Sequence, residues 1–397
     1  MYYTTPNSKV GTIFGTTQEE LETPVQGSDR VILVCIFMLM TVGAIAVYSS
    51  IAYFAQSHGT SAATLVSSHI VKLAIAFIAM IVASKLNYRV LARFSRIAVV
   101  FSWILLIAVM VYGDMVFGAR RSLSIAGFSF QPSSFAVMAL ILHVAVLLHE
   151  KQEYIKDFKR AFIPILIWVT TTCFLIALED FSSAALLMGI SICMMFVGRI
   201  SAVQLLGLIL IGIIGGSSLV MSSPERTSRV TDYITQVKDI NSENLESSNG
   251  YQAQQAHIAI ARGGLFGVGI GKSTQRDFLP APYNDFIFAI ITEEYGVLGS
   301  TAVMLIFIVI LYRGVGVIAR HSPDALGTLL ALGATLMITL YGFVNAAVAT
   351  GLFPVTGLPM PFISYGGTSM LFAGVMVGVL LNISKHNQKT QNRFYNC

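Results

Sequence analysis

The fold is decided by residues 31–53, which read VILVCIFMLMTVGAIAVYSSIAY and carry no charged side chain. A helix needs about 20 apolar residues to cross a hydrocarbon core of roughly 30 Å, because each residue adds about 1.5 Å. Similar blocks recur along the chain, in which 55% of the residues are hydrophobic and 11% are charged, against about 25% charged in soluble domains. This composition excludes a soluble protein and predicts an all-α integral membrane protein.

The apolar blocks predict ten transmembrane helices. They lie at residues 31–53, 68–84, 97–116, 131–148, 161–178, 182–198, 203–221, 285–312, 325–350 and 362–383. The connection between the seventh and eighth spans, residues 222–284, is long, whereas the other connections are short. An even number of spans places both termini on the same side of the membrane.

The basic residues predict that both termini are cytoplasmic. Most of the 25 Lys and Arg residues fall in segments that this orientation places inside, as the positive-inside rule requires. The chain then divides into a cytoplasmic tail at 1–30, a membrane domain at 31–384 and a second cytoplasmic tail at 385–397. The long loop 222–284 is extracytoplasmic in this topology.

Two features point to a function on the outer face. One is the long loop itself, and the other is the pair Arg120 and Arg121, which the positive-inside rule disfavours in a short outer loop. The alternative is that the two arginines contact outer-leaflet phosphates and that the loop is an insertion without function. The charge pattern alone leaves both interpretations open.

A glycine-rich run at 263–271 precedes Lys272 and Ser273 and is similar to a nucleotide phosphate loop. That motif requires glycine five residues before Gly271, but position 266 is phenylalanine, and the outer side offers no cytoplasmic nucleotide. A nucleotide site is therefore not expected. Closely spaced glycines can still bring backbone amides near a ligand, and Lys272 and Arg276 add positive charge that suits a diphosphate.

Three carboxylates, Asp285, Glu293 and Glu294, lie where apolar sequence resumes after the long loop. Ionisable groups inside a span cost about 2.5–3.5 kcal/mol each, so they face a cavity or a partner. For Glu293 and Glu294 we favour pairing with a basic residue of another helix. For Asp285 we favour a functional role, because a group at the water interface can titrate and meet a substrate. Lys72, a lone base inside the second span, is expected to pair with a carboxylate or to extend to the interface.

The last outer connection, residues 350–369, reads TGLFPVTGLPMPFISYGGTS. Its prolines and glycines exclude a regular helix, and irregular backbone at membrane depth is tolerated only against protein or a water-filled cavity. The segment is therefore expected to line a site.

Several motifs, in order along almost the whole chain, resemble those of the shape, elongation, division and sporulation (SEDS) family, to which the FtsW and RodA proteins belong. The motifs are VYSS at 47–50, GARRSL at 118–123, FSFQPSS at 128–134, GYQ at 250–252, RGGLFGVGIGKSTQ at 262–275, LPAPYNDFIFAIITEEYG at 279–296 and GLPMPFISYGGTS at 357–369. The resemblance implies ten spans with both termini inside, which agrees with the topology above. The segment 350–369 and the polar N-terminal extension favour the FtsW branch.

The resemblance implies a peptidoglycan glycosyltransferase of the bacterial cytoplasmic (inner) membrane. Such an enzyme polymerises lipid II outside the membrane, with a class B penicillin-binding protein as transpeptidase partner and with other division or elongation proteins. No nucleic acid is expected as a partner. Two alternatives stay open, a lipid II flippase and an inactive scaffold that recruits a transpeptidase.

Asp285 falls on the aspartate of the family's DFIF motif, which implies that it is the general base or the ligand of a divalent metal, Mg or Mn. Basic residues would neutralise the departing undecaprenyl diphosphate: Arg120, Arg121, Arg229, Lys272 and Arg276. Further substrate contacts are expected from Gln131, Gln255, Ser273, Gln275, Ser364 and Tyr365.

The chain departs from the family pattern at five positions. It has Ser122 in place of tryptophan, Ser134 and Val137 in place of glutamate and lysine, and Ala281 and Tyr283 in place of glutamate and histidine. Four of these changes remove a titratable group. They weaken the prediction of a metal site and keep the scaffold alternative open.

Overall fold

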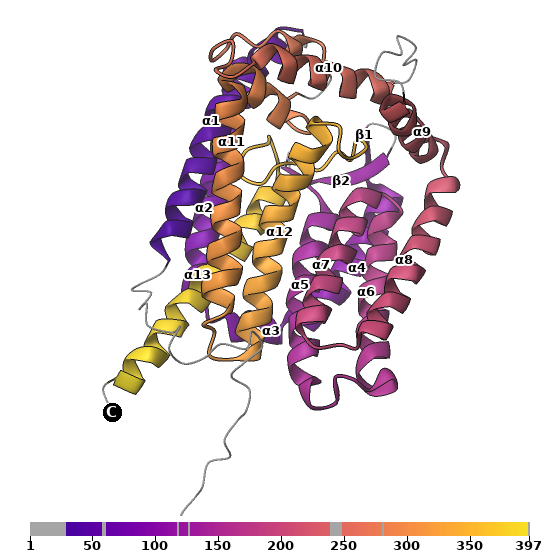
Figure 1. Cartoon of the computed structure of the whole chain (residues 1–397), viewed down its shortest axis with the longest axis vertical. Helices are drawn as coiled ribbons and strands as arrows, with labels where there is room; N and C mark the ends of the chain where they lie inside the picture. The colour runs from indigo at the N-terminus through magenta and orange to yellow at the C-terminus, as the bar shows by residue number, and fades with distance from the viewer. Residues whose placement is uncertain are drawn as a thin grey trace, which may run out of the picture.

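The chain folds into a bundle of long helices that run along one common axis (Figure 1). A computed structural model describes residues 29–57, 61–116, 119–125, 128–238, 248–279 and 282–395. The long helices are α1 (Arg30–Ser57), α2 (Ala62–Lys85), α4 (Ser95–Tyr112), α5 (Pro132–Glu150), α6 (Ile163–Ala177), α7 (Phe181–Val197), α8 (Ala202–Met221), α11 (Ile287–Leu311), α12 (Ala325–Ala349) and α13 (Thr368–Tyr395).

A helix lies at each of the ten predicted spans. Nine helices in the described part of the chain are long and apolar enough to cross a membrane, and the remaining one, α7, is a shorter apolar helix of 17 residues. Several boundaries were predicted wrongly. Helix α2 begins at Ala62 and not at 68, α4 ends at Tyr112 and not at 116, and α13 runs from Thr368 to Tyr395 and not from 362 to 383. Helix α13 begins late because the prolines and glycines of the preceding segment keep it irregular.

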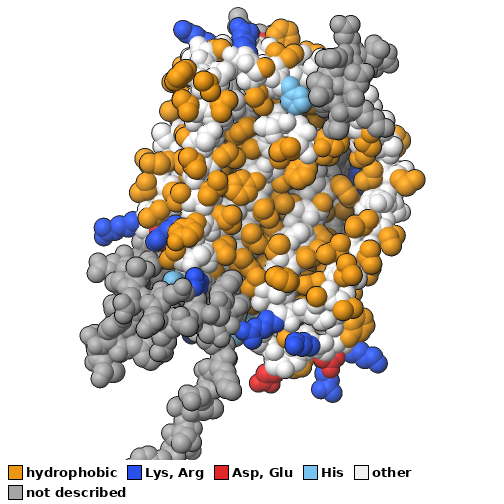
Figure 2. All heavy atoms as spheres, in the orientation of Figure 1, with side chains coloured by type: hydrophobic (Ala, Val, Ile, Leu, Met, Phe, Trp, Pro, Cys, Tyr) orange, Lys and Arg blue, Asp and Glu red, His pale blue; other side chains and the backbone are white. Residues whose placement is uncertain are grey.

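The surface of the bundle is that of a membrane protein. Figure 2 shows hydrophobic side chains over its lateral surface, whereas most Lys and Arg side chains lie towards the two ends, the larger group at the lower end. The start of α1 and the end of α13 lie towards this lower end (Figure 1). There Asp29, just before α1, pairs with Arg313 at an N–O distance of 2.8 Å. Both ends of the bundle segment thus lie on the side with most basic residues, as predicted.

The predicted long outer loop is largely helical. It contains α9 (Pro224–Lys238), α10 (Ser248–Gly263) and the short 3-10 helix η4 (Gln275–Asp277), which cover the upper end of the bundle in Figure 1. The opposite end is closed by short elements: α3 (Tyr88–Arg93), η2 (Gln152–Tyr154), η3 (Phe158–Phe162) and η5 (Tyr312–Ala319).

The prediction of a purely helical chain misses a small antiparallel sheet, which lies at the end of the bundle predicted to be extracytoplasmic. Its strands are β1 (Asp114–Val116), β2 (Ala119–Ile125) and β3 (Phe128–Phe130), in that order. Met115 pairs with Arg120, and Leu123 pairs with Phe130. Arg120 and Arg121 therefore lie on a strand held on both sides by hydrogen bonds, not in a free loop. Such short strands carry too little periodicity to be found from the sequence.

Helices α5 and α12 form the centre of the bundle, and α8 lies at its edge. In the apolar windows of α5 and α12, 78% and 72% of the residues are buried within the protein, against 11% in α8. Because α12 is fixed in this core, it provides a rigid support for the irregular segment 351–367 that follows it and for the start of α11 beside it.

Candidate active site

Asp285 lies in the turn just before α11, at the end of the bundle that was predicted to be extracytoplasmic. Asn345 of α12 holds this turn, because its Nδ2 donates to the carbonyl oxygens of Asp285 at 3.0 Å and of Leu358 at 2.8 Å. The amide thus joins the Asp285 turn to the irregular segment 351–367. The Oδ1 atom of Asp285 is buried and accepts no hydrogen bond from the protein. A fixed backbone carries a carboxylate oxygen that is free to receive a proton.

Gly357 lies beside both the carboxylate of Asp285 and the guanidinium of Arg121. A Cβ atom built on Gly357 would lie 3.6 Å from Asp285 Oδ2 and 4.0 Å from Arg121 Nη1. Gly357 has a φ of +70°, a region in which glycine is favoured because it has no Cβ. The turn at Gly357 therefore lets the segment 351–367 pass close to both charged groups.

A cavity of about 670 Å³ opens beside this point. Its charged lining consists of Arg121 from β2, Arg226 and Arg229 from α9, and the acids Glu179 and Glu225. Arg226 is already used, because its Nη2 donates to the carbonyl oxygen of Leu178 at 2.7 Å. The guanidinium of Arg229, by contrast, still has a free donor, since its buried Nε has no hydrogen-bond partner. The cavity can accept an anionic group.

The electrostatics of the site agree with this geometry. Burial raises the pKa of the Asp285 carboxyl to about 6, an effect that Arg121 and Arg229 oppose and that Asp180 supports. Burial and the nearby Arg121 lower the pKa of the Arg229 guanidinium. A carboxyl that titrates near neutral pH can take up a proton, and an incompletely compensated guanidinium favours an anion beside it.

The residues at Asp285 do not form a metal cage. Among the described residues, no group of three or more His, Cys, Asp and Glu side chains could hold a metal ion. The charged side chains that act on Asp285 are Arg121 and Arg229, which repel a cation, and Asp180, which attracts one. The predicted Mg or Mn site at Asp285 stays a prediction.

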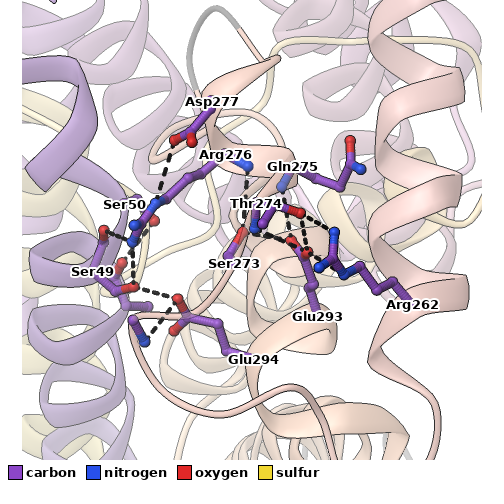
Figure 3. Close-up of polar contacts among 12 residues, drawn as sticks. Ser49, Ser50, Arg262, Ser273, Thr274, Gln275, Arg276, Asp277, Glu293 and Glu294 are labelled. Carbon is purple, nitrogen blue, oxygen red and sulfur yellow. Dashed lines mark hydrogen bonds and ion pairs between the residues drawn. The ribbon is translucent and has the colours of Figure 1, made fainter.

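Ser273, Gln275 and Arg276, which were predicted to bind substrate, lie in a second polar cluster with Glu293 and Glu294 of α11 (Figure 3). The fully buried Glu293 accepts hydrogen bonds from Ser273 Oγ, from Thr274 N at 3.1 Å and from Gln275 N at 3.3 Å. Arg262 of α10 lies 3.9 Å from the same carboxylate. Glu293 thus has the basic partner that was predicted for it, on a helix of the outer loop.

Glu294 joins this cluster to α1 and to the glycine-rich run. Its carboxylate accepts hydrogen bonds from Ser49 Oγ of α1 and from the backbone amide of Gly271 at 3.1 Å. Arg276 donates to the carbonyl oxygen of Ser49 at 2.8 Å and pairs with Asp277 at 3.4 Å. The side chain of Arg276 is thus engaged with α1 and with its own loop.

The glycine-rich run packs on α11 itself. A Cβ atom on Gly263 or Gly267 would lie 2.0 Å or 2.1 Å from the carbonyl oxygens of Thr292 and Glu294. Val268 N donates to the carbonyl oxygen of Glu293 at 2.9 Å, at the place where Gly296 interrupts α11. The close approach of this backbone to α11 explains the glycines, and the anion that Gly271 binds is the carboxylate of Glu294.

The chain resembles known proteins along nearly its whole length. Residues 29–389 match the family of FtsW, RodA and SpoVE, described as cell cycle proteins. The chain belongs to this family. Stage V sporulation protein E of Bacillus subtilis (strain 168) is 36% identical over 365 residues, which are 91% of this chain and 98% of that protein. A probable peptidoglycan glycosyltransferase FtsW of Geobacter sp. (strain M18) is 32% identical over 364 residues, 91% of this chain and 97% of that protein.

A solved structure supports the fold of this FtsW/RodA/SpoVE family member. A chain from a study of how a peptidoglycan synthase complex coordinates polymerization and crosslinking has a TM-score of 0.70 to it at 22% identity, covering 90% of this chain and 97% of that one. Since relatives named SpoVE and FtsW both match over nearly the full length, the FtsW branch stays a prediction.

The other predicted site residues of this family member do not gather at one place. Ser364 supports the Asp285 turn, because its Oγ donates to the carbonyl oxygen of Asn284 at 2.7 Å, and Tyr365 N donates to that of Tyr283 at 2.8 Å. Gln131 precedes α5, and its backbone amide donates to Thr368 Oγ1 at 2.9 Å. The remaining three are Gln255, half-buried on α10, Lys272, which is exposed, and Arg120, whose side chain lies outside the described residues.

Three residues of the site were missed in the sequence. Arg226 lies one helical turn before Arg229 on α9, a spacing that could have indicated a basic helix face. Asn345 is a buried amide inside a span, a feature that by itself indicates a functional or structural contact. Thr356, whose buried Oγ1 has no hydrogen-bond partner, gave no signal, because its position beside the cavity depends on the path of the segment 351–367.

Replacing Glu293 by alanine should destabilise this family member by about 3 kcal/mol, because three donors and Arg262 would lose a buried carboxylate. The measurement is the thermal unfolding midpoint of the purified protein in detergent. Glu153→Ala, at an exposed position of η2, is the matched control and should leave the midpoint unchanged. Equal midpoints for the two variants would refute a structural role for Glu293.

Proposed function

We propose that the chain is a peptidoglycan glycosyltransferase that polymerises lipid II at the outer face of the bacterial cytoplasmic membrane, for cell division or elongation. The observation that carries the proposal is the free, buried carboxylate oxygen of Asp285 beside an arginine-lined cavity. The names of the FtsW relatives support the reaction class. The membrane-embedded fold supports a lipid-linked substrate.

The reaction needs a base for a hydroxyl and a site for a leaving anion. In our proposal the Asp285 carboxylate takes the proton of the acceptor sugar hydroxyl as that oxygen bonds to the anomeric carbon of the donor sugar. The bond from this carbon to the diphosphate breaks, and undecaprenyl diphosphate leaves with its electron pair. Arg121 and Arg229 stabilise the negative charge of the diphosphate through charge-assisted hydrogen bonds. Every step uses side chains that line or adjoin the cavity.

We further propose a class B penicillin-binding protein as the transpeptidase partner, with other division or elongation proteins around it. The support is the similar fold of a chain from a structure described as a peptidoglycan synthase complex. Polymerisation and crosslinking of the same glycan strands would then occur in one assembly at the outer face.

The geometry favours this reaction over lipid II transport. A flippase requires polar groups across the bilayer, and inside the predicted spans Glu293, Glu294 and Lys72 are the ionisable residues that could provide them. Glu293 and Glu294 are both engaged by the glycine-rich run at the outer end of α11, so they do not form a path through the membrane. An inactive scaffold would need neither a free carboxylate oxygen nor an unpaired arginine beside it.

The test is glycan-chain synthesis from labelled lipid II by the purified chain, alone and with its cognate class B penicillin-binding protein, with and without Mg or Mn. Polymer that requires this chain supports the proposal. If lipid II binds but no polymer forms under any of these conditions, the proposed activity is wrong and transport or scaffolding takes its place.

The rate of polymer synthesis should rise with pH through about pH 6 and become constant above it. The base acts only when ionised, and with a pKa of about 6 roughly one-tenth of Asp285 is ionised at pH 5. The measurement is the maximal rate between pH 5 and 8, with the unfolding midpoint recorded at each pH as a control. A rate that is constant down to pH 5 would exclude Asp285 as the titrating base.

A further inference from the structure

Lys72 of α2 carries a positive charge that no acidic side chain within the described ranges neutralises. Its Nζ lies 3.9 Å from the ring centroid of Tyr365. No carboxylate in the described part of the chain forms an ion pair with it, although the sequence predicted such a partner or an extended side chain. A half-buried ammonium on a membrane helix is costly, and a ring face compensates it only in part. The site favours an anion.

His69, one helical turn before Lys72, provides a second polar group without a partner. Its side chain is 1% exposed, and neither Nδ1 nor Nε2 has a hydrogen-bond partner in the structure. The imidazole stacks on Tyr365, with the ring centroids 5.5 Å apart. Buried polar atoms are almost always paired, so two such nitrogens beside an uncompensated ammonium indicate that something else binds there.

This cluster adjoins the Asp285 turn on the side opposite the arginine-lined cavity. Tyr365 contacts Tyr283 edge-on, at a centroid distance of 5.5 Å, and Tyr283 precedes Asp285 by two residues. The cavity approaches Asp285 from Gly357 and Arg121. Figure 1 places α2 and α9, which carry the two groups of basic residues, on opposite sides of the bundle. Two cationic sites thus flank one carboxylate.

We propose that Lys72, His69 and Tyr365 bind the diphosphate of the acceptor lipid. The proposal rests on the proposed function, because joining two lipid-linked sugars brings two diphosphates to the enzyme, of which only the donor's leaves. The arginine-lined cavity would take the leaving diphosphate. The acceptor's diphosphate is separated from the reacting hydroxyl by the intervening sugars, and Lys72 is correspondingly separated from Asp285 by the rings of Tyr365 and Tyr283.

The test counts the undecaprenyl diphosphate molecules that bind to the purified complex of the chain with its class B penicillin-binding protein. Asp285→Asn is included, because it lacks the proposed base and should still bind two molecules. Lys72→Gln should bind one, and Lys72→Arg should bind two. The matched control Lys85→Gln, at the exposed far end of the same helix, should also bind two. In the polymerisation assay Lys72→Gln should raise the KM for lipid II about tenfold, the loss typical of one charge-assisted hydrogen bond, with little change in kcat.

The outcomes separate this inference from the proposed function. The second diphosphate site does not exist if Lys72→Gln retains both molecules at wild-type affinity or loses both of them. The same conclusion follows if the wild type binds only one molecule. Displacement of the second molecule by excess phosphatidylglycerol would show an ordinary headgroup site and would also overturn the inference. Failure of the wild type to make polymer, with two molecules still bound, would overturn the proposed reaction and leave the anion site of Lys72 supported.

Discussion

Replacing Asp285 by asparagine should lower the rate of lipid II polymerisation by about 10²- to 10⁴-fold, the contribution typical of a general base. The amide has nearly the shape of the carboxylate, so the backbone contact of Asn345 with residue 285 should persist. The amide nitrogen cannot accept the proton of the acceptor hydroxyl at neutral pH. The measurement is the initial rate of glycan-chain synthesis from labelled lipid II with the cognate class B penicillin-binding protein present.

The stability of the same variant provides the control. The pKa of Asp285 rises from 3.8 to about 6 on folding, so its ionisation destabilises the folded state progressively from about pH 4 to pH 6 and fully above that. At pH 7.5 the Asp285→Asn protein should therefore unfold at the same temperature as the wild type or at a higher one. An inactive variant with an unchanged midpoint identifies Asp285 as the base. Unchanged synthesis would exclude it.

Replacing Arg121 by glutamine should lower kcat about 100-fold and change the KM for lipid II much less. The Arg121 guanidinium and the Asp285 carboxylate both lie beside Gly357, and the charge that Arg121 stabilises grows as the diphosphate leaves. An interaction that strengthens in the transition state affects kcat more than substrate binding. The measurement is the dependence of the initial rate on lipid II concentration.

Two further variants make this result specific. Arg121→Lys keeps the charge but loses the planar guanidinium, so it should recover part of the rate. Arg93→Gln, at an exposed position of α3 at the opposite end of the bundle, should leave the rate unchanged. A fall in rate for Arg93→Gln as large as that for Arg121→Gln, or a change confined to KM, would show that Arg121 does not act on the leaving group.

The glycine-rich run shows where a sequence motif is ambiguous. Closely spaced glycines indicate a close approach of backbone to an anion, and the structure has such an approach. The anion is the carboxylate of Glu294, whereas the motif had suggested an external diphosphate. Residues 23 positions apart make this contact, and only the packing of the outer segment on α11 decides which anion the amides meet.

The sequence by itself determined the membrane fold, the position of the ten long helices and the common side of the two ends of the bundle, and it singled out Asp285 and the segment 350–369 as candidates for the site. These follow from local properties, because span length, charge at span ends and helix-breaking residues act within a window of about 20 residues. Only the tertiary structure decided which polar residues meet. It joined Asp285 with Arg121, Arg229 and Gly357, and it directed Ser273, Gln275 and Arg276 to α1 and α11. Such contacts join distant parts of the chain through the packing of helices, which no local pattern encodes.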